Sequence, residues 1–234
     1  MMHTNQSARL PKSGNSPVKR LTGVCLVGLA AQIATGALAS GQAPRLMDRQ
    51  KEIALALSAC PAFVAGKAAV YALDKSGYIK VRDSQNGFTA IVQHSMPTSQ
   101  EPRCMDAEGT RTHLPRILKM AELRAQGKSR EEIDRFVADA FAKGIFQAPV
   151  RPGVDYMLST ENLVTIDEDK GIVAPFPPHV MFYAPYLTNA ELGSDGKPGG
   201  PAFVAGEGTP HALIIVPLGS HTGLGHEAGK GGSQ

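Results

Sequence analysis

The sequence predicts an α+β fold: an antiparallel meander and further strands, with a helical hairpin inserted between them. Two observations lead to this prediction. Short segments with strand-like alternation or apolar runs lie on both sides of residues 114–144, whereas apolar residues within 114–144 recur at helical spacing. Strands that are grouped, instead of alternating one by one with helices, are typical of α+β folds.

The meander is expected from three short segments that follow one another closely. Strands are predicted over residues 69–73, 78–82 and 88–93, with turn sequences between them. The second turn closes on Asn-Gly, which tolerates the positive φ angles of a tight hairpin, so consecutive strands are expected to pair. In the middle strand Ile79 and Val81 alternate with charged residues, which predicts one buried face and one wet face.

Helices are expected in two places. Apolar residues recur at helical spacing over residues 46–60 and again over 114–126. A third helix begins at Ser129, because Ser129 at the N-cap and Glu132 at N3 form a capping box, and Gly144 stands where a helix C-cap glycine is common. The second and third helices form the predicted hairpin.

The second half of the chain is expected to return to β structure. Strands are predicted over residues 156–159, 163–166, 172–174, 180–183 and 212–216, the last of them as a central strand between two prolines.

The first 39 residues have the pattern of a secretory signal peptide. Lys19-Arg20 precede an uncharged, largely apolar run that ends in Ala37-Leu38-Ala39, the small-residue pattern that a signal peptidase accepts. A retained membrane anchor is the alternative, since the run is long enough to cross a bilayer. We expect a signal peptide over 1–39, a single α+β domain over 40–218 and a disordered glycine-rich tail over 219–234.

Charge and motifs exclude several function classes. Residues 1–39 contain four basic residues and no acidic one, so without them the totals of 24 Lys and Arg and 21 Asp and Glu leave the rest of the chain slightly negative. Clustered bases are what nucleic-acid binding needs, so no nucleic-acid partner is expected. Nucleotide-binding glycine motifs and serine nucleophile motifs are also missing from the sequence. No cofactor is expected, except zinc under the alternative below.

Two cysteines, Cys60 and Cys104, remain once Cys25 leaves with the leader. In an oxidising compartment an even pair of cysteines favours a disulfide. Two separate buried thiols are the alternative, and geometry decides between them, since the Cα atoms of a disulfide lie within about 7 Å.

His179 and His211 are the candidate catalytic histidines. Each follows a proline and opens an apolar strand, so both imidazoles could lie at one end of the sheet if the strands pair. Together with Glu207 they would form a His/His/carboxylate set suited to Zn²⁺ or to acid–base chemistry near neutral pH. The alternative is that Pro-His only opens a strand, with the imidazole bonded to the backbone.

Residues 101–113 form a second candidate site, expected to be a polar loop beside a cleft. Such a loop could bind an anion through its arginines or hold paired carboxylates, or it could be a solvated loop pinned by a disulfide at Cys104. Its candidate binding residues are Arg103, Asp106, Glu108, Arg111 and His113.

Four segments resemble a group of uncharacterised exported bacterial proteins with no known activity. They are Tyr78-Ile-Lys-Val-Arg82, Asn86-Gly-Phe-Thr-Ala-Ile-Val92, Met181-Phe-Tyr-Ala-Pro-Tyr-Leu-Thr-Asn189 and His211-Ala-Leu-Ile-Ile-Val-Pro217. The resemblance implies export but supplies no catalytic residues. It also implies a cysteine at the place of Ala90, opposite the one that matches Cys104. This chain departs there, and Cys60 could substitute as the partner.

Taken together, the sequence predicts an exported protein, periplasmic or secreted, with a binding or envelope-associated role and an unknown partner. No membrane span is expected after signal cleavage. The alternative is an exported hydrolase or metal-dependent enzyme that uses His179, His211 and a nearby carboxylate.

Overall fold

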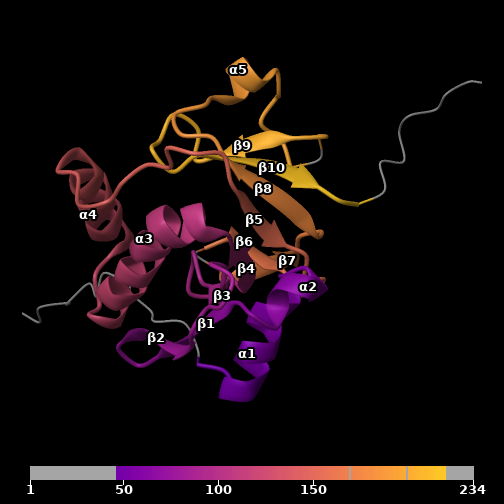
Figure 1. Cartoon of the computed structure of the whole chain (residues 1–234). Helices are drawn as coiled ribbons and strands as arrows, with labels where there is room; N and C mark the ends of the chain where they lie inside the picture. The colour runs from indigo at the N-terminus through magenta and orange to yellow at the C-terminus, as the bar shows by residue number, and fades with distance from the viewer. Residues whose placement is uncertain (1–45, 169, 199, 220–234) are drawn as a thin grey trace, which may run out of the picture. The chain divides into compact units, whose positions relative to one another are not determined.

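An eight-stranded mixed sheet with the strand order β2-β1-β3-β4-β5-β8-β10-β9 is the main element of the computed structural model (Figure 1). The structure describes residues 46–168, 170–198 and 200–219, all of them in the unit Leu38–Gln234 of the two into which the chain divides. The strands of the sheet are β1 (Ala69–Asp74), β2 (Gly77–Arg82), β3 (Thr89–Gln93), β4 (Glu101–Met105), β5 (Val154–Met157), β8 (His179–Tyr183), β9 (Phe203–Ala205) and β10 (Leu213–Pro217).

A separate antiparallel hairpin and five helices complete the described elements, and together they confirm the α+β fold. The hairpin pairs β6 (Leu163–Asp167) with β7 (Ile172–Pro175), where two consecutive strands were predicted. The helices are α1 (Arg49–Ser58), α2 (Ala62–Ala65), α3 (Ala107–Ala125), α4 (Arg130–Ala142) and α5 (Asn189–Leu192). The predicted signal peptide and all but the first residue of the predicted tail lie outside the described residues. Within the described part of the chain, no helix combines the length and apolar character that a membrane crossing requires.

Helices α1 and α3 cover opposite faces of the first half of the sheet (Figure 1). Strand β3 explains this arrangement, because its successive side chains point to opposite faces. Ala90 and Val92 pack with α1, whereas Ile91 packs with Leu114 and Ile117 of α3. All three β3 residues are fully buried, so this strand has to lie inside the sheet.

The predicted meander is wrong in one respect. β1 and β2 form the expected antiparallel hairpin, but β3 pairs in parallel with β1 instead of returning onto β2. The Asn86-Gly87 segment makes no hairpin; the Asn86 side chain donates to the carbonyl oxygen of Val64 and ties this connection to the end of α2. β2 is left at the edge, where Ile79 and Val81 are 42% and 37% exposed, so their predicted burial is also wrong.

Residues 101–113 were expected to form a polar loop, and this expectation is wrong. They form strand β4 and the first turns of α3. Asp106 begins the helix, since its side chain accepts a hydrogen bond from the backbone N–H of Gly109 (2.9 Å). Gly109 is required at that place, because a Cβ built there would lie 1.9 Å from the hydroxyl oxygen of Tyr183. Helix α3 also contains Pro115, so tertiary packing overrides a sequence that disfavours a helix.

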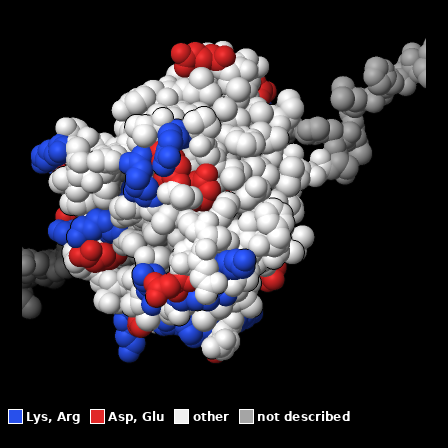
Figure 2. Space-filling model, in the orientation of Figure 1, with Lys and Arg blue, Asp and Glu red and all other residues white. Residues whose placement is uncertain are grey.

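The helical hairpin formed by α3 and α4 is as predicted. The capping box of Ser129 and Glu132 is present, and Gly144 has the left-handed φ of 68° that follows a helix end. Ion pairs three or four residues apart, such as Lys128 with Glu132 and Arg130 with Asp134, cover its exposed surface. Acidic and basic side chains adjoin one another in the same way on the face shown in Figure 2.

The hexapeptide Pro-Ala-Phe-Val-Ala-Gly occurs twice and folds differently each time. At residues 61–66 it forms the helical turn α2, with Phe63 84% exposed. At residues 201–206 it forms strand β9, in which Phe203 is buried. Sequence analysis did not predict β9, because the hexapeptide has no strong preference of its own and its partners decide its structure.

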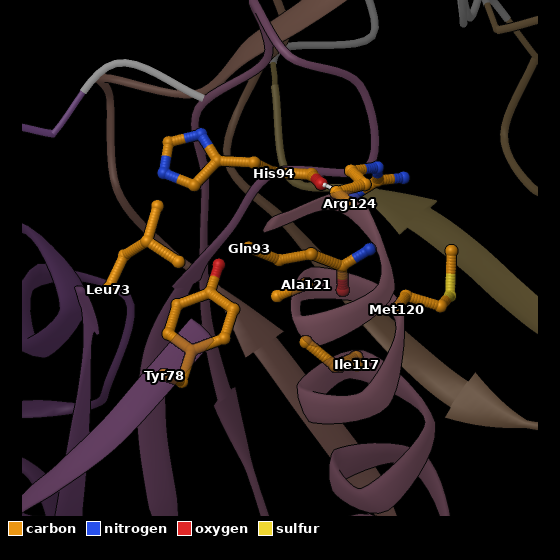
Figure 3. Close-up of a pocket in the computed structure, with 8 residues that line it drawn as sticks. All are labelled: Leu73, Tyr78, Gln93, His94, Ile117, Met120, Ala121 and Arg124. Carbon is orange, nitrogen blue, oxygen red and sulfur yellow. Dashed lines mark hydrogen bonds between the residues drawn. The ribbon is translucent and has the colours of Figure 1, made fainter. Parts of the chain in front are cut away.

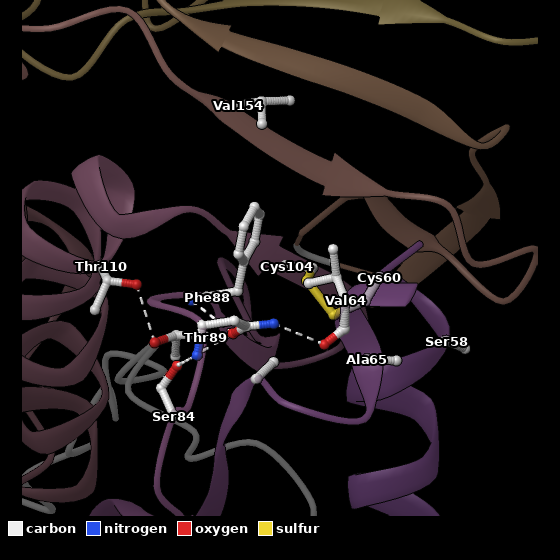
Figure 4. The surroundings of a disulfide bond; sticks show 12 residues. Ser58, Cys60, Val64, Ala65, Ser84, Phe88, Thr89, Cys104, Thr110 and Val154 are labelled. Carbon is white, nitrogen blue, oxygen red and sulfur yellow. Dashed lines mark hydrogen bonds between the residues drawn. A yellow bond between two sulfur atoms is a disulfide. The ribbon is translucent and has the colours of Figure 1, made fainter. Parts of the chain in front are cut away.

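Cys60 and Cys104 form a disulfide, with their Cα atoms 5.1 Å apart (Figure 4). It joins the turn after α1 to the middle of β4, on the face of the sheet that α1 covers. Ala90 of β3 lies directly opposite Cys104 in the strand register. The bridge therefore fastens α1 to the sheet at the position next to Ala90.

Candidate functional site

A groove of about 520 Å³ lies between the helical hairpin and two loops, the one that follows β8 and the one that precedes β10. α3 and α4 supply one wall, and the segments around residues 186 and 209–211 supply the other. Most of its lining is apolar, Arg116 is its buried polar residue, and His211 is half-buried. The residues that line it include Arg116, Met120, Val137, Phe141, Tyr186 and His211. Val137 and Phe141 are four residues apart and share one face of α4.

Arg116 lines this groove as a buried cation without a carboxylate. Its side chain is only 8% exposed, and its Nε has no hydrogen-bond partner. Its Nη1 donates to the sulfur atom of Met120 (3.4 Å), a weak acceptor, and none of the ion pairs in the described residues includes it. Burial, and then Arg103 and Arg124, lower the Arg116 pKa to about 10, so the group stays charged at neutral pH. An unpaired buried charge is costly, and an anion bound at this position would offset that cost.

His211 stands beside Arg116 in the groove wall. Its ring stacks on Phe141 with the centroids 5.5 Å apart, and its buried Nδ1 has no partner. Burial, and then the positive charges of Arg116 and Arg103, lower the His211 pKa to about 3. The imidazole is therefore neutral at physiological pH and adds a hydrogen-bonding group to the groove without adding charge.

His113 lies close to the groove and is also neutral. It is 1% exposed, and neither ring nitrogen has a hydrogen-bond partner. Its ring stacks on Tyr183 (4.9 Å between centroids), whose hydroxyl donates to Asp106 Oδ1 and to the carbonyl of Val154, each at 3.1 Å. Burial, then Arg103, Arg116 and the neighbouring His211, hold the His113 pKa well below its usual value.

Arg103 and Asp155 form a buried ion pair within the sheet. Arg103 Nε donates to Asp155 Oδ2 (2.9 Å), Nη2 contacts the same oxygen, and Nη1 donates to Gln93 Oε1 (2.5 Å). Asp155 is fully buried, and its Oδ1 has no partner. The pair joins the adjacent strands β3, β4 and β5, and Arg103 is therefore not free to bind an anion.

The other candidates of the 101–113 segment hold the start of α3 in place. Asp106 Oδ2 accepts from the backbone N–H of Val154 (2.9 Å) in addition to its capping bond. Glu108 accepts from Arg111 Nη2 (2.6 Å) and from the N–H of Val150 (2.8 Å), and these contacts, Arg111 first, lower its pKa to about 2. Residues 101–113 are therefore not the expected loop, and Arg111, like Arg103, already has a carboxylate partner.

His179, His211 and Glu207 do not come together. β8 and β10 are antiparallel, and in their register His179 lies opposite Pro217, whereas Leu213 lies opposite Tyr183. His179 and His211 each precede or begin their own strand, so antiparallel pairing places them at opposite ends. His179 Nδ1 lies 2.9 Å from the carbonyl oxygen of Pro177, as the backbone-bonded alternative predicted. The expectation of a shared strand end is therefore wrong.

Glu207 has a structural role in the loop between β9 and β10, which also contains His211. Its Oε2 accepts from the backbone N–H of Asn189 (2.8 Å) and from Asn189 Nδ2 (3.0 Å). The Asn189 amide in turn bonds the outer edge of β9, with Oδ1 accepting from Val204 N–H (2.7 Å) and Nδ2 donating to Val204 O (3.1 Å). Among the described residues, no three His, Cys, Asp or Glu side chains are grouped so that they could hold a metal ion.

A second cavity lies under the hairpin but holds only about 10 Å³ (Figure 3). Tyr78, Gln93, His94 and Ile117 are among its lining residues. Arg124 closes it from α3 by donating to the carbonyl oxygens of His94 and Ser95. A space of this size accommodates about one water molecule, so this cavity is not a ligand site.

Sequence analysis missed Arg116 and Tyr186. Arg116 is a charged residue in a predicted helix, where such residues are usually exposed, yet it lies three residues after His113 and on the same side of α3. Tyr186 is the one described residue other than glycine with a positive φ (65°), and its N–H donates to the carbonyl of Thr209 (2.8 Å). Backbone strain of this kind is concentrated at functional sites, but no pattern in the sequence predicts it here.

His211 in the groove and the nearby His113 are expected to make the protein less stable in mild acid. Their pKa values are lowered by folding from 6.5, so the unfolded chain binds protons that the native state does not. Stability is complete above pH 6.5 and falls below it, by about 1.4 kcal/mol per histidine and pH unit. Urea unfolding at pH 7.5 and pH 5.5 measures this change.

The variant His211→Asn isolates the histidine contribution from buried groups of opposite sign, such as Glu101, whose pKa burial raises. It is expected to lose about 1.4 kcal/mol less than the wild type between these two pH values. Equal losses in the two proteins would contradict the prediction.

Comparisons with known proteins add no relative: no protein-family model, curated protein or solved structure matches the chain.

Proposed function

We propose that this protein is an exported binding protein whose groove between the helical hairpin and the β8–β10 loops holds a small organic anion. The observation that carries the proposal is Arg116. Of the described Lys and Arg residues, only Arg103 and Arg116 are buried, and Arg103 has Asp155 as its partner. Arg116 is the buried cation that forms no ion pair within the described residues, and it lies at a groove large enough for a ligand.

Export is supported by three features that point the same way. The leader pattern over 1–39 is that of a secretory signal peptide, and the segments quoted above resemble exported bacterial proteins. The disulfide between Cys60 and Cys104 is typical of an oxidising compartment. A periplasmic or secreted location follows as part of the proposal.

The alternative of a hydrolase or metal-dependent enzyme built on His179, His211 and Glu207 receives no support from the geometry. His179 lies at the opposite strand end from His211, and His179 and Glu207 are each occupied by backbone or amide contacts. We therefore propose a binding role.

The variant Arg116→Met tests the proposal. In a thermal-shift screen of the purified protein against organic acids, amines, sugars and peptides, organic acids are expected to stabilise the wild type. Stabilisation amounts to about 2.7 kcal/mol at a ligand concentration of 100 times Kd. Arg116→Met is expected to abolish this response, whereas Arg135→Met, at an exposed position of α4 outside the groove, is expected to retain it.

A second readout separates binding from a structural role. Without ligand, Arg116→Met is expected to be as stable as the wild type or more stable by about 1–3 kcal/mol, because it removes an unpaired buried charge. Loss of stability together with an unchanged ligand response would overturn the proposal.

A further inference from the structure

The charge that the groove offers to a ligand is a single positive one. Arg116 supplies it, and the adjacent imidazoles of His113 and His211 are neutral near pH 7. The acidic group in the lining is Asp134, which is exposed and paired with Arg130 at 3.6 Å. A second negative charge on a ligand would have no cation beside it in the groove and would lose solvation on binding.

The unpartnered atoms favour a carboxylate as the charged group. A guanidinium presents a planar fork of donors that matches the two oxygens of a carboxylate. Arg116 Nε is buried without a partner and Nη1 has only the Met120 sulfur, so no carboxylate of the described residues occupies the fork. His211 Nδ1 is also buried without a partner, and in the tautomer with a proton on Nδ1 it is an unsatisfied donor in the wall of the same groove.

The rest of the groove favours an aliphatic body. Met120, Val137, Ala138, Phe141 and Ala142 form a continuous apolar wall from α3 to α4. On the other side lie Pro210 and the ring of Tyr186, which is 60% exposed. A sugar or a short peptide would leave its polar groups unpaired against this wall, whereas a hydrocarbon chain buries apolar area there.

We infer that the ligand of the groove is a medium-chain aliphatic monocarboxylate, bound with its carboxylate against Arg116 and its chain along Val137 and Phe141. The inference rests on the proposed function and adds to it the number of ligand charges and the nature of the ligand body.

Calorimetric titration at pH 8 with four probes of equal chain length tests the charge. Decanoate is expected to bind, and decanol and decyltrimethylammonium are expected to bind at least tenfold more weakly. Decyl phosphate, a dianion at this pH, is also expected to bind at least tenfold more weakly than decanoate. Gluconate, an anion with a polar body, tests the apolar wall and is expected not to bind.

Variants locate the site. Arg116→Lys keeps the charge but loses the fork, so it is expected to weaken decanoate binding at least tenfold. Ala138→Trp places a large side chain in the groove from an exposed helix position and is expected to abolish binding. Asp139→Trp, at the neighbouring exposed position outside the groove, is its matched control and is expected to bind normally.

The outcomes separate the inference from the proposed function. If decyl phosphate or gluconate binds best and Ala138→Trp abolishes that binding, the monocarboxylate inference fails and the anion-binding function stands. If decanol or the cation binds best, if no probe binds, or if decanoate binds Ala138→Trp as it binds the wild type, both fail.

Discussion

Replacing Asp155 by alanine is expected to lower the free energy of unfolding by about 3–5 kcal/mol, the largest effect expected of any single substitution in this protein. Asp155 is the carboxylate partner of Arg103, and both side chains are buried. The substitution leaves the guanidinium in the sheet with only Gln93 as a side-chain acceptor. Equilibrium unfolding in urea, followed by far-UV circular dichroism, measures the loss.

The double variant Arg103→Met/Asp155→Leu is the control for this prediction. Replacing both members of a buried pair by apolar side chains of similar size is often neutral or stabilising, so most of the loss is expected to be recovered. A double variant as unstable as Asp155→Ala would show that the site depends on the shape of the pair instead of on its charge balance.

Removing the disulfide is the second change with a large expected effect. The bridge closes a segment of 44 residues, and chain entropy predicts that Cys60→Ala/Cys104→Ala lowers the free energy of unfolding by about 4 kcal/mol. The same loss is expected when the wild type is unfolded in urea with a reductant present. Equal stability of the oxidised and reduced forms would contradict the prediction.

A variant in which Cys104 pairs with a cysteine at position 90 instead of Cys60 is the matched control for the loss of the disulfide. Ala90 lies opposite Cys104 in the antiparallel pair of β3 and β4, and residues so placed are close enough for a disulfide. Cys60→Ala/Ala90→Cys is expected to recover part of the lost stability, and less than the native bridge gives, because the loop it closes is shorter.

Local signals explain which parts of the fold could be predicted. The capping box of Ser129 and Glu132, the glycine after α4 and the hairpin of β6 and β7 each depend on residues within a few positions of one another. Such features are visible in a sequence because their hydrogen bonds are short-range. The α+β class followed from their order along the chain.

Long-range packing explains the rest. Nothing near β3 in the sequence reveals that it pairs with β1 instead of β2, since the choice depends on burial between α1 and α3. The two copies of Pro-Ala-Phe-Val-Ala-Gly show the same limit, because identical residues become a helix in one setting and a strand in the other.

The candidate site could be predicted less well than the fold. The histidines stood out as titratable residues at strand ends, but the direction of strand pairing decided that they would not meet. Arg116 was the informative residue, and its burial depends on α4 and the loop around His211, which are distant in the sequence. A charged residue in a helix reads as exposed unless its tertiary neighbours are known.

The amide of Asn189 has a consequence for self-association. An edge strand has unpaired backbone N–H and C=O groups, and a strand of a neighbouring molecule can hydrogen-bond to them, which is a common first step in aggregation. At β9 the N–H and C=O of Val204 are already occupied by this side chain, which Glu207 holds in position. Strand-by-strand growth between molecules is thereby blocked at this border of the sheet, and at the opposite border β2 carries the charges of Lys80 and Arg82, which oppose it.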